Sequence, residues 1–178
     1  MNEVKVLDKV FRKSISHNKI METVARMAAD LDRDLMGKDP LFLSVLNGSF
    51  IFSSDLFKML LMPCTISFVK MSSYEGESTT GKVKELIGLS EDIKGKTVVI
   101  LEDIIDTGLT MQKFLSILKE KEPADIRIAS LLFKPEAFKG DYKIDYLGMS
   151  IPNDFIVGYG LDYNGYGRNN KAIYTVIQ

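Results

Sequence analysis

The chain has 178 residues, of which 46% are hydrophobic and 26% are charged, as in an ordinary globular protein. This length suits a single domain, residues 1–178, and is short for two domains with separate cores. The 23 Lys and Arg residues nearly balance the 24 Asp and Glu residues, and the net charge of -1 argues against a nucleic-acid-binding protein, which usually carries a strongly basic face.

Apolar periodicity predicts the elements of the first part of the chain. A helix is expected over residues 19–36, because apolar residues recur there every three or four positions and Gly37 stands where the helix should end. The uninterrupted apolar run at 41–46 predicts a strand that is buried on both faces. A second helix over 49–61 and a strand over 65–71 are expected to follow.

The next segment, residues 72–84, has a different character. It is polar, contains two glycines and shows neither the helical nor the strand period. We expect a long mobile loop here, because loops of this length inside a compact domain often close over an active site. A strand is expected immediately after it, near residues 85–89.

The second half of the chain alternates strands with helices. The apolar run at 97–101 predicts a buried strand, and a helix is expected after Thr107, running to about residue 120. Further strands are expected at residues 126–133, 146–149, 155–158 and 173–176. This alternation predicts an α/β fold with a mostly parallel central sheet flanked by helices, and the closely spaced late strands predict a small β-rich subdomain beside it.

The lone cysteine, Cys64, excludes an internal disulfide and favours a reducing, cytoplasmic location. Charged residues interrupt the N-terminal segment, so we expect no secretory signal there. The most apolar region, residues 41–62, contains Asn47, Asp55 and Lys58. It therefore predicts a buried strand and helix rather than a membrane span.

Residues 98–110 carry the strongest functional signal of the chain. A buried strand is followed by two adjacent carboxylates, Glu102 and Asp103, and a turn containing Asp106 then opens a helix. In open α/β sheets, ligands bind beyond the carboxyl ends of the strands. Carboxylates at that edge can bind sugar hydroxyls, or hold a Mg2+ ion that offsets the charge of a phosphate.

The start of the following helix predicts a phosphate site. Its first backbone N–H groups can bind an anion, the hydroxyls of Thr107 and Thr110 add donors, and Gly108 lets a phosphate approach the backbone closely. The alternative is an ordinary strand end whose side chains cap a helix. A lone Asp-Thr-Gly would favour that alternative, but the neighbouring carboxylate pair favours a binding site.

This segment resembles the phosphoribosyl-pyrophosphate-binding motif of type I phosphoribosyltransferases, and the chain resembles hypoxanthine-guanine phosphoribosyltransferases over nearly its whole length. Further blocks match in the family's order and spacing, at residues 46–49, 73–74, 130–134, 151–152, 155–164 and 168. The resemblance implies the type I phosphoribosyltransferase fold, in which a small β-rich hood stands beside the mostly parallel sheet.

The resemblance also implies roles for the matching residues. Asp106 is the catalytic general base near N7 of the purine. The phosphoribosyl group is bound by Glu102, Asp103, Thr107, Gly108 and Thr110. Pyrophosphate is bound by Asn47, Gly48, Ser73, Tyr74 and Arg168. Mg2+ is associated with Glu102, Asp103 and Asp162.

The purine site implied by the resemblance consists of three residues. Lys134 donates to the oxygen at C6, Phe155 stacks on the base, and Ile156 contributes backbone contacts. Taken singly, Lys134 would be a lysine that reaches the surface from a strand end, and Phe155 would be a core residue. Only their joint placement with the phosphate motif favours a purine site.

Two residues depart from the family's pattern. Asn47 stands where many relatives have Lys or Arg, and Leu109 replaces a lysine that some relatives carry in the phosphate loop. The family contacts pyrophosphate at the first position mainly through backbone amides, so we expect that site to be retained with a changed affinity. Both departures leave Asp106 in place.

The activity implied by the resemblance is purine salvage: hypoxanthine or guanine reacts with phosphoribosyl pyrophosphate and Mg2+ to give IMP or GMP and pyrophosphate. It further implies small-molecule substrates, no nucleic-acid or membrane partner, and a homodimer or homotetramer. Two alternatives remain, a xanthine-preferring relative and a regulatory protein of the same fold that senses nucleotides or phosphoribosyl pyrophosphate. The retention of Asp106, Lys134 and the long loop favours an enzyme over the regulatory protein.

Overall fold

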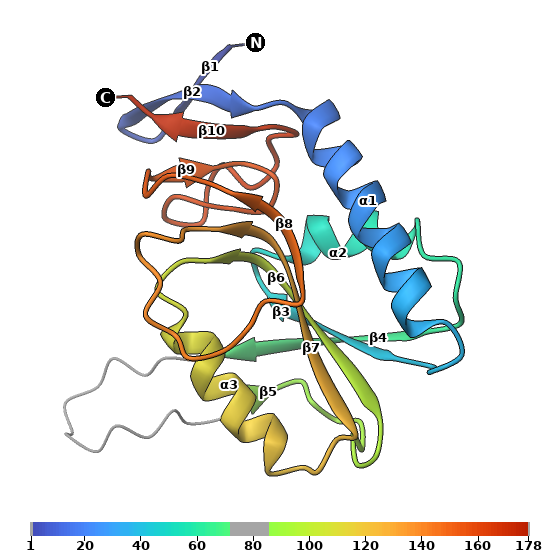
Figure 1. The fold of residues 1–178 in the computed structure, drawn as a ribbon. Coiled ribbons are helices and arrows are strands. Elements are labelled where there is room, and N and C mark those ends of the chain that lie inside the picture. Colours follow the sequence, from blue (N-terminus) through green and yellow to red (C-terminus); the bar gives the residue numbers. More distant parts are fainter. Residues whose placement is uncertain (1, 72–85, 178) are drawn as a thin grey trace, which may run out of the picture.

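The computed structural model describes residues 2–71 and 86–177, which form a large sheet covered by helices and a smaller sheet above it (Figure 1). The predicted loop at residues 72–84, with Ser73 and Tyr74, lies outside the described residues.

The large sheet has six strands in the order β5-β4-β3-β6-β7-β8. Their bounds are β3 Leu41–Leu46, β4 Thr65–Met71, β5 Leu86–Ile87, β6 Thr97–Ile105, β7 Asp125–Phe133 and β8 Tyr146–Ser150. Neighbours pair in parallel, except that β5 runs antiparallel to β4. The predicted mostly parallel sheet is confirmed, and its central strands are apolar runs because both of their faces are covered.

Helices cover both faces of this sheet. α1 (His17–Leu35) and α2 (Phe50–Phe57) share a core with one face, and α3 (Leu109–Lys119) shares a core with the other (Figure 1). Neighbouring residues of β6 enter different cores, with Val99 in the first and Ile100 in the second. None of the helices in residues 2–71 and 86–177 is long and apolar enough to cross a membrane.

Two helix ends differ from their predicted positions. α1 begins earlier, at His17, because the Ser16 side chain caps it by accepting a hydrogen bond from a first-turn amide. α2 ends earlier, at Phe57, and the chain then turns so that two following amides donate to the Asp32 carboxylate of α1. Side-chain contacts therefore decide both boundaries.

The small sheet, called the hood below, has the antiparallel order β1-β2-β10-β9. Its strands are β1 Glu3–Val6, β2 Lys9–Ile15, β9 Ile156–Val157 and β10 Ile173–Val176. The predicted β-rich subdomain is confirmed, but its membership differs. Half of it is the N-terminal hairpin, which was not predicted because its turn at Leu7 contains no glycine. β8 was grouped with the late strands, yet it pairs with β7 in the large sheet.

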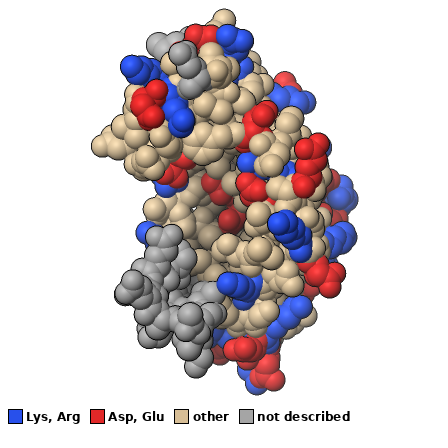
Figure 2. All heavy atoms as spheres, turned by 90° about the vertical axis from the view of Figure 1, so that its left-hand side faces the viewer, with Lys and Arg blue, Asp and Glu red and all other residues tan. Residues whose placement is uncertain are grey.

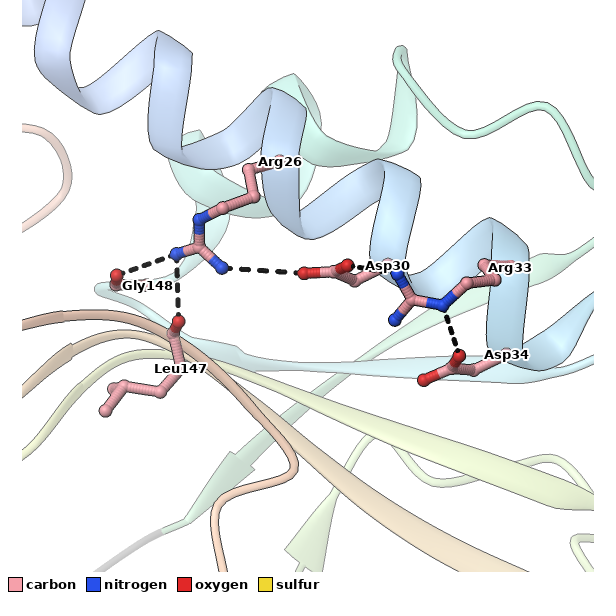
Figure 3. Close-up of polar contacts among 6 residues, drawn as sticks. All are labelled: Arg26, Asp30, Arg33, Asp34, Leu147 and Gly148. Carbon is pink, nitrogen blue, oxygen red and sulfur yellow. Dashed lines mark hydrogen bonds and ion pairs between the residues drawn. The ribbon is translucent and has the colours of Figure 1, made fainter.

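A charged ladder on α1 covers the outer edge of β8 (Figure 3). The Arg26 guanidinium donates to the carbonyls of Leu147 and Gly148 at 3.0 and 2.9 Å, and it pairs with Asp30 at 3.5 Å. Arg33 then links Asp30 to Asp34. An edge strand presents unpaired carbonyls, which can recruit another chain. Arg26 donates to two carbonyls of this edge strand and fixes α1 against the sheet.

Candidate active site

A cleft with a volume of about 350 Å3 lies between the hood and the carboxyl ends of the large sheet, and Figure 2 shows acidic side chains on its floor. It is lined by Asn47, Gly48, Asp103, Ile104, Asp106, Lys134, Phe155, Ile156, Leu161, Asp162 and Arg168. No role was predicted for Ile104 and Leu161. The other lining residues are predicted site residues, so the structure brings together segments from four separate parts of the sequence.

Asp106 and Lys134 meet at the carboxyl ends of neighbouring strands. β6 and β7 pair with Ile105 opposite Phe133, so the residues that follow leave the sheet side by side. The Lys134 ammonium donates to Asp106 Oδ2 at 3.0 Å. The Lys134 side chain is 9% exposed and the Asp106 side chain 46%. The cleft thus presents a cationic donor next to a carboxylate acceptor.

The hood contributes an aromatic ring and apolar surface to the cleft. Phe155 precedes β9 and is 42% exposed, and its ring packs edge-on against Tyr163 with 5.6 Å between centroids. The next residue, Ile156, is buried, and Ile104 and Leu161 add further apolar surface. An exposed aromatic ring that is held by a second ring suits stacking on a planar ligand.

The acidic pair lies within a strand rather than beyond its end, because β6 continues to Ile105. Asp103 faces the cleft, and burial raises its pKa to about 6 although the Arg168 charge acts in the opposite direction. Glu102 does not line the cleft. Burial and the neighbouring Asp103 raise the pKa of Glu102 well above its usual value, and its Oε2 atom is buried without a hydrogen-bond partner in the described part of the chain.

Gly48 is enclosed by the two walls of the cleft. It follows Asn47, whose peptide bond to Leu46 is cis. A Cβ atom at Gly48 would overlap the Asp103 carboxylate, and a Cβ atom at Gly160 of the hood would overlap the Gly48 carbonyl oxygen. The loop therefore passes between β6 and the hood with room only for glycine at both contacts.

Arg168 and Asp162 form a hydrogen-bonded unit on the hood side. Arg168 Nη2 lies 2.6 Å from Asp162 Oδ1, and Nη1 donates to the Gly160 carbonyl at 2.7 Å. Asp162 Oδ2 also accepts from the Gly165 amide at 2.6 Å. These bonds fix the direction in which the guanidinium faces the cleft.

The predicted phosphate loop lies at the start of α3, adjacent to the cleft-lining Asp106. Thr107 and Thr110 are exposed, and Gly108 adopts a positive φ of 76°. A second segment supports the loop from behind, because Tyr142 Oη donates to the Gly108 carbonyl at 3.1 Å and the Lys139 amide donates to the Thr107 carbonyl at 2.9 Å. The helix start and both threonines remain accessible to an anion.

Comparisons with known proteins agree with this geometry. A model of the phosphoribosyl transferase domain matches residues 13–164. The chain belongs to the phosphoribosyltransferase family. The hypoxanthine-guanine phosphoribosyltransferase of Streptococcus pneumoniae is 39% identical over 156 residues, which are 87% of either chain. The Homo sapiens protein of the same name is 38% identical over 180 residues, 96% of this chain and 81% of that one.

Solved structures show the same similarity in three dimensions. A hypoxanthine-guanine phosphoribosyltransferase from Bacillus anthracis superposes with a TM-score of 0.85 and 36% identity, covering 99% of both chains. A hypoxanthine phosphoribosyltransferase from Staphylococcus aureus gives a TM-score of 0.84 and 33% identity, covering 99% of this chain and 92% of that one. The type I phosphoribosyltransferase fold with its hood is thereby confirmed.

The two sequence departures of this phosphoribosyltransferase occupy accessible positions. Asn47 lines the cleft, and Leu109 is 49% exposed at the first position of α3. A lysine at either position would add a positive charge near a bound anion. Ile104 could have been found from the sequence, because it is the apolar residue directly between Asp103 and the turn that carries Asp106.

Asp103→Asn should stabilise this phosphoribosyltransferase at neutral pH. The folded-state pKa of about 6 lies above the ordinary 3.8, so between these values the folded protein keeps a proton that the unfolded chain has released. The stability supplied by that proton is complete below pH 3.8 and is lost as the pH rises through 6. The amide has no charge to bury, so the free energy of unfolding should exceed that of the wild type by about 1–3 kcal/mol at pH 7.

Urea denaturation without Mg2+ measures this difference. The gain should shrink when the measurement is repeated near pH 4, where the wild-type carboxyl is protonated in the folded state and no charge is buried. A gain that is equal at both pH values would contradict burial of the charge as its cause.

Proposed function

We propose that this phosphoribosyltransferase transfers the phosphoribosyl group of phosphoribosyl pyrophosphate to N9 of hypoxanthine or guanine, as a step of purine salvage. The observation that carries the choice of base is the contact between Lys134 Nζ and Asp106 Oδ2 at 3.0 Å. On the edge of a 6-oxopurine, the acceptor O6 lies beside N7. A lysine beside an aspartate matches that edge when N7 carries a proton, since Lys134 then donates to O6 and Asp106 accepts from N7.

The same pair argues against adenine as the substrate. Adenine carries a donor amino group at C6, which cannot accept a hydrogen bond from an ammonium group. Phe155 supplies the stacking face for the purine ring, and Ile104 and Ile156 supply apolar contacts. The relatives compared above are named for hypoxanthine and guanine, in agreement with this choice.

The phosphoribosyl pyrophosphate would extend from the phosphate loop to the opposite wall of the cleft. Its 5′-phosphate fits the start of α3 with Thr107, Gly108 and Thr110, and Asp103 faces the cleft beside Gly48, where it suits the ribose hydroxyls. The pyrophosphate group then falls near Asn47, Gly48 and Arg168, which offer backbone amides and a guanidinium. Ser73 and Tyr74 are proposed to join it from outside the described residues.

The carboxylates of the cleft fit a Mg2+ site that is completed by substrate. Among residues 2–71 and 86–177, no three His, Cys, Asp or Glu residues are grouped to hold a metal by themselves. Mg2+ commonly uses one or two carboxylates together with substrate phosphates and water, so Asp103 and Asp162 suffice as protein ligands. Bound there, Mg2+ would offset the charge of the departing pyrophosphate.

Each of these residues would then have a separate role in the reaction. The bond between ribose C1 and the pyrophosphate oxygen breaks while the bond from C1 to N9 forms, and the proton leaves N7 for Asp106. Lys134 holds O6 and so fixes the base in the plane of attack. Arg168 and the amides near Gly48 stabilise the negative charge that develops on pyrophosphate.

The test is a turnover assay with phosphoribosyl pyrophosphate and each of hypoxanthine, guanine, xanthine and adenine, with Mg2+ or with a chelator. We expect Mg2+-dependent formation of IMP and GMP and no product with adenine. Product with xanthine alone would establish the xanthine-preferring alternative. Tight binding of phosphoribosyl pyrophosphate without product from any purine would contradict the enzymatic function and support the regulatory alternative.

A further inference from the structure

Tyr159 connects the hood to α2. It lies in the loop after β9, is 2% exposed, and its hydroxyl donates to Asp55 Oδ2 at 2.8 Å. Asp55 belongs to α2 and lies 104 residues away in the sequence. Its other carboxylate oxygen accepts from Lys58 Nζ at 2.7 Å, and its side chain is 16% exposed. A charge-assisted hydrogen bond with so little solvent access is stronger than one between neutral surface groups.

On one side, this bond reaches the loop at Gly48. α2 starts two residues after Gly48, and its first turn is fixed to β3 by three buried hydroxyls. Ser44 Oγ lies 2.8 Å from Ser49 Oγ and 2.7 Å from Ser53 Oγ. These contacts hold the loop, the first turn of α2 and β3 together. The position of Asp55 on α2 therefore helps to set the position of Gly48.

On the other side, the bond reaches the charged unit of the hood. The Tyr159 amide donates to the Asn170 carbonyl at 2.8 Å, and the next residue, Gly160, donates to the Arg168 carbonyl at 3.0 Å. Gly160 also accepts from the Arg168 guanidinium, which pairs with Asp162. The phenol thus lies at the base of the loop that presents Arg168 and Asp162 to the cleft.

We propose that Tyr159 and Asp55 are positioning residues, whose hydrogen bond fixes the spacing between Gly48 and the Arg168–Asp162 unit and thereby sets the affinity for the pyrophosphate end of the substrate. Neither residue lines the cleft, so each acts through the groups it holds. The proposal rests on the proposed function. Burial and the Asp55 charge raise the pKa of the Tyr159 phenol far above its ordinary value, so the group remains a hydrogen-bond donor at neutral pH.

Tyr159→Phe tests the bond while keeping the buried ring. We expect KM for phosphoribosyl pyrophosphate to rise about five- to tenfold, because the loss of one charge-assisted bond loosens the spacing without removing a ligand. The dissociation constant of Mg2+-pyrophosphate, measured by calorimetry, should rise by a similar factor. KM for hypoxanthine should change less than about twofold, because the Lys134–Asp106 pair is separate from this bond.

Asp55 provides the partner half of the experiment. Asp55→Asn keeps an oxygen that can accept from the phenol, so it should retain most of the wild-type affinity for Mg2+-pyrophosphate. Asp55→Ala should lose as much of this affinity as Tyr159→Phe. The double variant Tyr159→Phe/Asp55→Ala should be no worse than either single variant, because both remove the same bond. Tyr146→Phe is the matched control, since Tyr146 is also buried and its hydroxyl finds no hydrogen-bond partner within the described residues.

The outcomes separate the positioning role from a merely structural one. Equal losses of affinity for pyrophosphate and hypoxanthine, or an unchanged affinity for both, would overturn the proposal. If Tyr159→Phe does not fold, the comparison of Asp55→Asn with Asp55→Ala decides the question in the same way. A wild-type chain that binds Mg2+-pyrophosphate without turnover would remove the proposed function, yet the calorimetric comparison would still test the bond. A wild-type chain that binds no pyrophosphate would overturn both proposals.

Discussion

Asparagine in place of Asp106 should lower kcat by about two to four orders of magnitude, the range that a positioned general base contributes. The amide keeps the shape of the side chain and an oxygen that can accept from Lys134, but it cannot take the proton from N7. KM for phosphoribosyl pyrophosphate should change little, because the groups proposed to bind the substrate's phosphates lie elsewhere. Steady-state kinetics with hypoxanthine measure both constants, and the dependence of kcat on pH should change as well.

A matched control removes the same charge outside the cleft. Asp141 is exposed and does not line the cleft, so Asp141→Asn should retain wild-type turnover. Loss of the carboxylate beside the buried Lys134 should lower the stability of Asp106→Asn by about 1–2 kcal/mol, which a denaturation curve separates from the loss of activity. Full turnover of Asp106→Asn with an unchanged pH dependence would refute the general-base role.

Alanine in place of Gly48 should lower kcat/KM for phosphoribosyl pyrophosphate about 100-fold or more. The added methyl group would overlap the Asp103 carboxylate, which is 8% exposed and has little room to rotate away. Either Asp103 or the loop must move, and a displacement of about 1 Å in a positioned group costs on the order of 100-fold in rate. The binding of Mg2+-pyrophosphate should weaken in parallel, and calorimetry measures it without turnover.

Two further variants show whether the overlap is the cause. Gly37→Ala changes a glycine with a φ of 80° whose added methyl group would meet no neighbour, so it should cost about 1 kcal/mol of stability while leaving kcat/KM unchanged. Combining Gly48→Ala with Asp103→Ala removes the overlap and should recover stability but not activity. If Gly48→Ala binds pyrophosphate as tightly as the wild type, the close packing of this loop is not required for binding.

The strands of the large sheet were predictable because their signal is local. The runs at Leu41–Leu46 and Thr97–Ile105 are apolar over several consecutive residues, and such runs fit a parallel sheet that is covered on both faces. The two helix ends were less predictable. The Asp32 carboxylate of α1 accepts hydrogen bonds from two amides of the chain that follows α2. No pattern within α2 itself indicates that contact.

The site was predictable in its residue types and only partly in its geometry. The adjacent carboxylates, Asp106 and the helix start stand in one short segment, so their proximity follows from the sequence. The placement of Glu102 away from the cleft lining does not, because the predicted strand ended before the pair. β6 in fact runs to Ile105, and successive side chains of a strand point to opposite faces. The pKa of Asp103 likewise depends on burial by the hood and the loop at Gly48.

The sequence by itself determined the alternation of strands and helices, the turn that is proposed to bind phosphate and the chemical groups available at the carboxyl ends of the strands. These features depend on residues that are neighbours along the chain. Only the tertiary structure decided that the hood joins both ends of the chain, that Lys134 lies against Asp106, and that Tyr159 bonds to Asp55. Those contacts join residues far apart in the sequence, and they form only when the packing of two sheets and their helices brings the residues together.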